Sequence, residues 1–180
     1  MRNTLIAATA ACTPFALAAA PNHTFVDAGY VNLDGDLDGV GVKGSAAVHP
    51  RLHVYGEYDR VEDGPLTADS AALALGLNQP VTANTDLVAR IGWTKVNFDA
   101  GVGPDASDDG VMGQLGVRSA LSDALEVNSF VRHADLAGAD PSLSIGGVFG
   151  FTPTLGVSGD VEFDEDDTAY RVGLRWSFGA

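Results

Sequence analysis

The sequence predicts an all-β fold, an up-and-down antiparallel barrel of ten strands with eight as the alternative, and three observations support it. Runs of roughly ten residues that alternate apolar and polar side chains follow one another from Thr24 onward, as in barrel strands. Clusters of Asp, Gly, Pro and Asn, which favour turns, separate the runs. The connections alternate between an acidic kind and a less charged kind. The count falls to eight if two weak strands, the first in particular, pair poorly.

The first five strands are marked by apolar residues at alternate positions, which place their side chains on one face. In chain order these residues are Val26, Ala28 and Tyr30; Val40, Val42, Ala46 and Val48; Leu52, Val54 and Tyr58; Leu73, Leu75 and Leu77; and Leu87, Ala89, Ile91 and Trp93.

The second five strands continue the pattern, and no helical periodicity interrupts it. Their apolar faces are Val111, Leu115 and Val117; Leu125, Val127 and Val131; Leu143, Ile145, Phe149 and Phe151; Leu155, Val157, Val161 and Phe163; and Tyr170, Val172, Leu174, Trp176 and Phe178.

The alternation of connections predicts that the five acidic ones lie at one end of the barrel and both termini at the other. The acidic connections are "DGDLDG" from residue 34, "EDGP" from 62, "GPDASDDG" from 103, "AGADP" from 137 and "DEDD" from 164. The less charged ones are "HPR" from 49, "NQPVTANTD" from 78, "LSDA" from 121 and "TPT" from 152. This is the plan of a transmembrane barrel of the bacterial outer membrane, with the acidic loops outside.

The first twenty residues, "MRNTLIAATAACTPFALAAA", have the pattern of a secretory signal peptide. Residues 1–20 are assigned to it and residues 21–180 to a single barrel domain. The small residues Ala16 and Ala18 favour cleavage after Ala18. Cys12 lies inside the signal, so the exported chain has no thiol; acylation of Cys12 is the alternative, disfavoured by Thr9 three places before it. No later stretch is apolar over the roughly 18 residues that a transmembrane helix requires.

The polar face carries balanced charge although the whole chain has a net charge of -14. This negative charge argues against a nucleic-acid partner, whose phosphates would be repelled. Sixteen of the 24 acidic residues lie in or beside the five acidic connections, whereas the polar face carries six acidic and six basic side chains. Charges enclosed in a narrow lumen are costly unless paired, so this balance predicts a polar, filled lumen with an ion-pair network. Its predicted members are Asp27, Lys43, Glu57, Asp59, Arg90, Arg118, Glu126, Arg132, Asp160, Glu162, Arg171 and Arg175.

Aromatic residues on the apolar face predict two belts at the membrane interfaces. Tyr30, Tyr58, Trp93, Phe163 and Tyr170 are expected near the acidic end, and Phe151, Trp176 and Phe178 near the other. In the alternative, a β-sandwich or a lipocalin-like barrel, the same aromatic residues would face an apolar core. The charge balance of the polar face favours the membrane barrel.

Three segments, "DLVARIGWTKVNFD", "LGVRSALSDALEV" and "LGVSGDVEF", resemble the small outer-membrane proteins of xanthomonad bacteria once named as activators of plant immunity and linked to quorum sensing. The resemblance extends from about Gly29 to Phe178, and more broadly the chain is similar to OmpX-, Ail- and OmpA-like barrels. It implies a fold and an outer-membrane location, with no catalytic residues to carry over. The last strand also resembles the terminal signal read by the barrel assembly machinery. Here Gly179 and Ala180 follow the final aromatic, whereas the family pattern ends on it.

The candidate metal ligands are Asp34, Asp36 and Asp38 of "DGDLDG", which resemble the first half of a calcium loop. Asp164, Glu165, Asp166 and Asp167 could join other loops in weak binding of divalent cations. A complete loop needs a bidentate Glu at its twelfth position, where Ser45 stands, so weak divalent-cation binding or a simple acidic hairpin turn is expected. Cations bound along the acidic rim would also bridge to lipopolysaccharide phosphates. No other cofactor is expected.

A hydrolase would use His133 with Asp135, but alternation points His133 toward lipid, and no nucleophile accompanies it. His53 is expected to join the lumen network. Barrels of about eight strands are filled by side chains and those of about sixteen leave a channel, so a ten-stranded charged lumen is expected to be plugged. The sequence therefore predicts a non-enzymatic, monomeric barrel with a structural or surface-interaction role, in contact with outer-membrane lipid, lipopolysaccharide and an unknown surface ligand. A narrow passive channel is the alternative.

Overall fold

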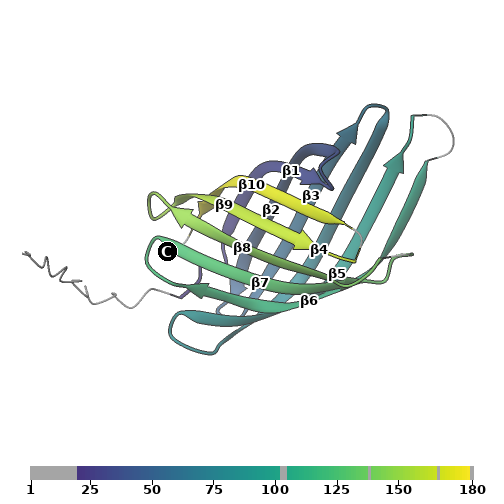
Figure 1. Cartoon of the computed structure of the whole chain (residues 1–180). Coiled ribbons are helices and arrows are strands. Elements are labelled where there is room, and N and C mark those ends of the chain that lie inside the picture. Colours follow the sequence, from purple (N-terminus) through teal and green to yellow (C-terminus); the bar gives the residue numbers. More distant parts are fainter. Residues whose placement is uncertain (1–19, 102–104, 138, 166, 179–180) are drawn as a thin grey trace, which may run out of the picture.

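The chain forms a closed barrel of ten antiparallel strands in the computed structural model, which describes residues 20–101, 105–137, 139–165 and 167–178 (Figure 1). Each strand pairs with its neighbours in the chain, and the first closes the ring by pairing with the last. The strands are β1 (Phe25–Leu33), β2 (Leu37–His49), β3 (Leu52–Asp63), β4 (Leu66–Pro80), β5 (Thr85–Asp99), β6 (Ala106–Ala120), β7 (Leu125–Ala134), β8 (Ser142–Gly150), β9 (Leu155–Phe163) and β10 (Thr168–Ser177). The ten-strand prediction is confirmed, and the eight-strand alternative is wrong.

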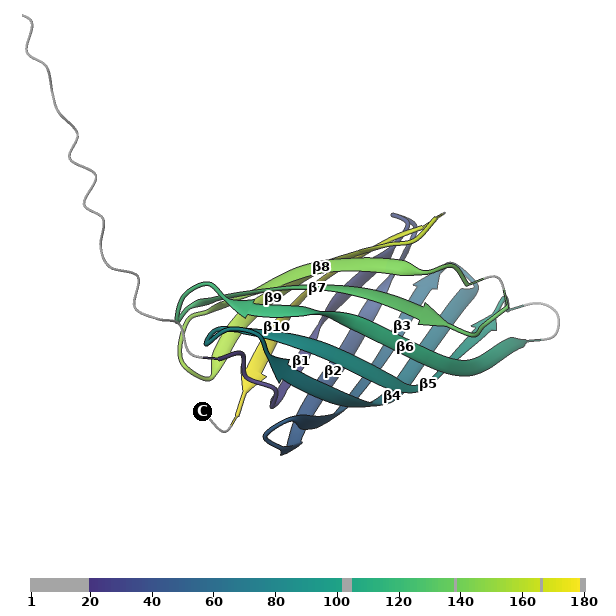
Figure 2. The same ribbon diagram turned by 90° about the horizontal axis from the view of Figure 1, so that it is seen from below.

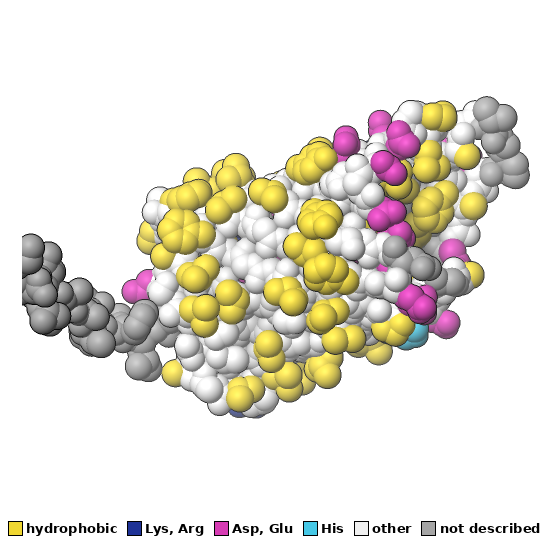
Figure 3. Space-filling model, viewed as in Figure 1, with side chains coloured by type: hydrophobic (Ala, Val, Ile, Leu, Met, Phe, Trp, Pro, Cys, Tyr) yellow, Lys and Arg dark blue, Asp and Glu magenta, His cyan; other side chains and the backbone are white. Residues whose placement is uncertain are grey.

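The barrel is apolar outside and polar inside, because alternate residues of each strand face opposite sides of the wall. Large apolar side chains cover the outer face, with Val40 and Ile91 each 65% exposed (Figure 3). Asp27 and His53, which face the lumen, are 1% and 0% exposed. This distribution excludes the sandwich and lipocalin alternatives, in which the apolar face would be enclosed.

The two ends of the barrel differ in charge as the connections predict. We name the end that carries the connections after β1, β3, β5, β7 and β9 the outer end, and the end that carries both chain termini the inner end. Acidic side chains gather at the outer end (Figure 3). β5 and β6, each 15 residues long, extend to the outer end in both ribbon views (Figures 1 and 2).

Two predicted connections are shorter than the sequence indicated. Residues 78–80 continue β4, because Asn78 pairs with Val88 and Pro80 with Asp86. Residues 106–110 already belong to β6, where Asp109 pairs with Lys95. The acidic and polar residues of these two segments indicated loops. In the structure the segments pair with residues of β5 and so lengthen β4 and β6.

The aromatic residues assigned to the two belts are all exposed on the outer face, between 42% and 60%. Four of the five aromatic residues expected near the outer end lie in the half of their strand that is next to that end, namely Tyr30, Tyr58, Phe163 and Tyr170. The fifth, Trp93, lies at the middle of β5. Trp93 lies farther from the outer end than predicted, because β5 continues beyond it to Asp99. The other three are at the inner end, namely Phe151, Trp176 and Phe178.

The described residues contain no helix that is long and apolar enough to cross a membrane. The predicted signal peptide, except Ala20, lies outside the described residues, as does the pair Gly179 and Ala180 at the end of the last strand.

Candidate functional site

Among the described residues, the lumen holds five close ion pairs, formed by ten of the twelve residues that the sequence placed in its network. Three of the pairs join strands that are not neighbours in the ring, so they cross the lumen. These are Lys43 on β2 with Asp160 on β9 at 2.5 Å, Arg171 on β10 with Asp59 on β3 at 2.5 Å, and Arg132 on β7 with Glu57 on β3. The other two join neighbouring strands, Arg118 with Glu126 at 2.7 Å and Arg175 with Asp27 at 3.0 Å.

Two predicted members, Arg90 and Glu162, have no oppositely charged side chain at ion-pair distance among the described residues. Arg90 donates hydrogen bonds from Nε to His53 Nε2 at 3.0 Å and from Nη1 to Gln114 Oε1 at 2.7 Å. Its guanidinium lies 4.0 Å above the Tyr55 ring, so neutral and aromatic groups replace the expected carboxylate. Glu162 accepts a hydrogen bond from Ser142 Oγ at 2.5 Å.

Glycine residues make room for the paired carboxylates. A Cβ added at Gly41 would lie 2.0 Å from Asp59 Oδ1, and one at Gly146 would lie 2.1 Å from Asp160 Oδ1. Such distances are far below van der Waals contact, so a side chain there would displace the carboxylate from its cation. The many small residues of the polar face therefore reflect a crowded interior.

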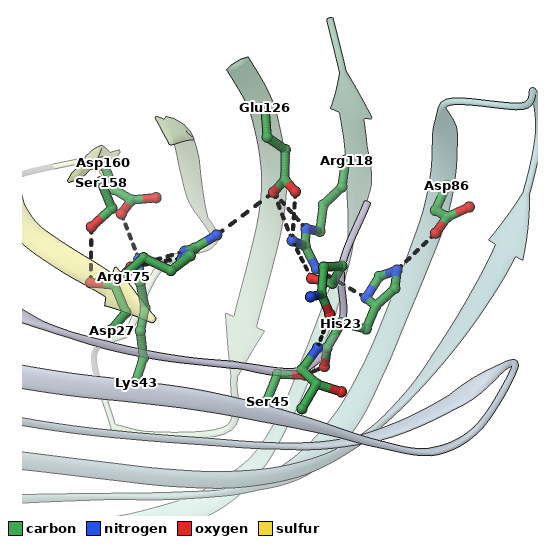
Figure 4. Close-up of polar contacts among 12 residues, drawn as sticks. His23, Asp27, Lys43, Ser45, Asp86, Arg118, Glu126, Ser158, Asp160 and Arg175 are labelled. Carbon is green, nitrogen blue, oxygen red and sulfur yellow. Dashed lines mark hydrogen bonds and ion pairs between the residues drawn. The ribbon is translucent and has the colours of Figure 1, made fainter. Parts of the chain in front are cut away.

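The segment that precedes β1 folds into the inner end of the lumen, where His23 contacts side chains of β2, β5 and β6 (Figure 4). His23 is 8% exposed, and its main-chain oxygen accepts a hydrogen bond from Ser45 Oγ at 2.7 Å. Its ring bridges Asp86 Oδ2, at 2.7 Å from Nε2, and Arg118 Nη1, at 3.0 Å from Nδ1. Phe25, the first residue of β1, is 4% exposed, with the Arg175 guanidinium 4.0 Å above its ring.

The contacts of His23 define its protonation state. An arginine can only donate hydrogen bonds, so Nδ1 accepts from Arg118, and Nε2 carries the proton that is donated to Asp86. Desolvation on burial, followed by the positive charge of Arg118, lowers the pKa of His23 from 6.5 to about 3. His23 is therefore a neutral bridge between two charged side chains, and its ring stacks on that of His53 with centroids 5.3 Å apart.

Sequence reasoning missed His23 and Asp86. His23 precedes the first strand, so no alternation indicates which way it points. Asp86 was included in the connection "NQPVTANTD", although it is the second residue of β5 and is 5% exposed. The alternation of β5, in which Val88 and Arg90 also face inward, could have identified Asp86 as a lumen residue.

Described residues line three cavities that follow one another along the lumen. The central one has a volume of about 80 Å³ and shares Glu57, Arg132 and Arg171 with the outer one, of about 330 Å³. It shares Arg118 and Arg175 with a third cavity, of about 520 Å³, at the inner end. Ion pairs thus separate a small central space from two larger ones.

The predicted cation site is not assembled. Asp34 and Gly35 have positive φ angles of 56° and 83° and form a tight turn, while Asp38 already belongs to β2. No group of three or more His, Cys, Asp or Glu side chains among the described residues is arranged to hold a metal ion. Asp34 and Asp36 thus belong to a hairpin turn, and Asp38 belongs to the strand that follows it.

His133 and Asp135 are both exposed, and His133 lies on the outer face of β7 opposite Gly113 of β6. His53 lies in the lumen and is fully buried.

No protein-family model and no curated protein sequence matches the chain. Among solved structures, the KdgM porin is similar with a TM-score of 0.53 at 8% identity, over 86% of this chain and 99% of that chain. The NanC porin is similar with a TM-score of 0.54 at 10% identity, over 86% of this chain and 100% of that chain. Ail, the attachment invasion locus protein of Yersinia pestis, matches with a TM-score of 0.44 at 12% identity, over 87% of this chain and 99% of that one. At these identities the first two matches show the fold alone, which is that of outer-membrane β-barrels.

Proposed function

We propose that the protein resides in the bacterial outer membrane and acts at the cell surface through its acidic outer end, as an interaction barrel rather than an enzyme or an open pore. The observation that carries this proposal is the separation of charge along the barrel. The lumen charges are largely paired, whereas the acidic side chains of the outer connections, among them Asp36, Asp63 and Glu165, are exposed.

The ion pairs that cross the lumen support the same proposal. Pairs such as Arg132 with Glu57 and Arg171 with Asp59 cross the interior between strands that are not neighbours. The central cavity, of about 80 Å³, is much smaller than the outer and inner cavities, of about 330 and 520 Å³. Free solute flow would require these pairs to separate, at a cost of several kcal/mol for each unpaired buried charge.

The partner is proposed to be a cationic surface, or an anionic one such as lipopolysaccharide bridged by divalent ions. The test compares adhesion of cells that carry the wild-type barrel with cells that carry a rim variant, in which five exposed outer acids are neutralised. Its substitutions are Asp36→Asn, Asp63→Asn, Asp105→Asn, Asp135→Asn and Glu165→Gln. The control is Asp123→Asn, an exposed acid at the inner end.

Adhesion to an amine-coated surface and to a lipopolysaccharide film with Mg²⁺ should fall in the rim variant and remain in the control. It should also weaken with added salt, because charges on exposed groups are screened over about 10 Å at 0.1 M and about 3 Å at 1 M. Unchanged adhesion in the rim variant would contradict the proposal.

A narrow channel is the second candidate, and the shared linings of the three cavities favour it. Separation of the pairs at Arg132 and Arg118 would join them into one path. Steady single-channel conductance of the purified protein in planar bilayers would replace the interaction proposal with this one.

A further inference from the structure

The outer cavity is a separate space between the ion-pair network and the outer end of the barrel. It has a volume of about 330 Å³, within the range of about 300–1,000 Å³ typical of small-molecule sites. Side chains from eight strands line it, and the pairs of Arg132 and Arg171 separate it from the central cavity. It is thus a cup whose floor is formed by lumen-crossing ion pairs.

One wall of this cup is apolar. Val31, Val61 and Ala68 form a buried cluster, at 5%, 6% and 8% exposure, on β1, β3 and β4. Val96 and Leu136 extend the apolar lining. Such a surface inside an otherwise polar lumen gains free energy when a ligand removes it from water, in proportion to the area covered.

The polar part of the lining is strongly negative. The two arginines of the floor are already paired with Glu57 and Asp59. The other charged side chains of the lining are all carboxylates, and the described residues that line the cavity include no further Lys or Arg. The carboxylates are Asp140, Glu162, Asp164 and Asp167, together with Asp69, whose carboxylate accepts a hydrogen bond from Tyr58 and lies 3.7 Å from Arg60. An anion would be repelled by this lining, whereas a cation would be attracted.

Glu162 is the carboxylate best placed to bind a ligand at depth. It lines both the outer and the central cavity, and among the described residues its hydrogen-bond donor is the neutral hydroxyl of Ser142. A positively charged donor beside Glu162 would form a charge-assisted hydrogen bond, which is about twice as strong as a neutral one.

We propose that the outer cavity binds a small organic cation, an amine or ammonium group joined to a short apolar body. The charged group lies beside Glu162, and the apolar body lies along Val31, Val61 and Ala68. This proposal rests on the proposed function only in one respect, that the outer end of the barrel faces the outside of the cell. Binding itself is a property of the purified barrel.

The probe is phenethylamine, titrated calorimetrically into purified barrel in detergent micelles at low salt, with empty micelles as the blank. Saturable binding is expected, and the neutral analogue 2-phenylethanol and the anion 3-phenylpropionate should bind much more weakly. Glu162→Gln should weaken phenethylamine binding roughly tenfold or more, the loss expected for one charged hydrogen bond. Ala68→Trp, which fills the cavity, should abolish it, while Asp123→Asn should leave it unchanged.

Equal binding of the neutral analogue, tighter binding of the anion, or a lack of saturable phenethylamine binding would overturn the proposal. So would unchanged affinity in both Glu162→Gln and Ala68→Trp, each checked for folding by circular dichroism. The rim variant spares every residue that lines the cavity, so it should lose adhesion and still bind phenethylamine. Glu162→Gln should show the reverse, which separates failure of this proposal from failure of the proposed function.

Discussion

Replacement of Arg175 by leucine tests whether the polar face is truly enclosed. Arg175 donates from Nε and Nη2 to Asp27 Oδ2, both at 3.0 Å, and its Nη1 lies 3.7 Å from Glu126 Oε1. The Asp27 side chain is 1% exposed, and its other oxygen accepts a hydrogen bond from Ser158 Oγ at 2.9 Å. In Arg175→Leu, Asp27 loses its cationic partner and keeps the neutral donor Ser158.

Removal of one partner of a buried ion pair costs about 3–5 kcal/mol of the free energy of unfolding. With a urea dependence of roughly 2 kcal/mol per molar, the unfolding midpoint falls by about 2 M. The assay is urea unfolding of the barrel in lipid vesicles, followed by tryptophan fluorescence. Val172→Leu, on the outer face of the same strand at 59% exposure, is the control and should shift the midpoint little.

The double variant Asp27→Asn with Arg175→Leu removes the uncompensated charge and should recover most of the loss, because a buried pair replaced as a unit is nearly neutral. Small and equal shifts for Arg175→Leu and Val172→Leu would show that the polar face is solvated. The inside-out assignment of the barrel would then be refuted.

Further predictions concern packing, pH and the fold. Gly41→Ala should lower the free energy of unfolding by about 1–3 kcal/mol, since the new Cβ would lie 2.0 Å from Asp59 Oδ1. Gly113→Ala is the control and should be tolerated, because no atom lies within 4 Å of the added Cβ. Equal unfolding midpoints of the two variants in urea would contradict this prediction. Because burial and Arg118 lower the pKa of His23 to about 3, the unfolded chain takes up a proton near pH 6.5 and the folded one only near pH 3. Stability should therefore be full above pH 6.5 and fall as the pH decreases toward 3, and His23→Asn should reduce this dependence; an identical pH profile in the variant would be evidence against the neutral bridge. Unboiled and boiled samples should migrate differently in detergent gels, and circular dichroism should show strand without helix, whereas recovery as a soluble periplasmic monomer would be incompatible with a membrane barrel.

Alternation within single strands was enough to predict the barrel. The side-chain period of a strand is two, so residues such as Val172 and Arg175 are assigned to opposite faces without knowledge of their neighbours. The order of acidic and less charged connections similarly predicted which loops share an end, because antiparallel strands reverse direction at every turn. Neither inference depends on long-range contacts.

The sequence could not predict which charged side chains of the lumen pair with each other. Equal numbers of acids and bases predicted that charges would be paired, but the partners of Lys43 and Arg132 depend on how the strands are staggered when the ring closes. For the same reason Arg90 was expected to have a carboxylate partner, and the structure instead places it between His53 and aromatic rings.

The sequence by itself thus determined the strand order, the apolar outer side and the acidic end, since each follows from local periodicity. Only the tertiary structure decided which charges meet, that the segment around His23 folds into the inner end, and that Val31, Val61 and Ala68 form an apolar wall in the outer cavity. These contacts join residues far apart in the chain, and the distance between them is set by closure of the barrel rather than by any pattern within one strand.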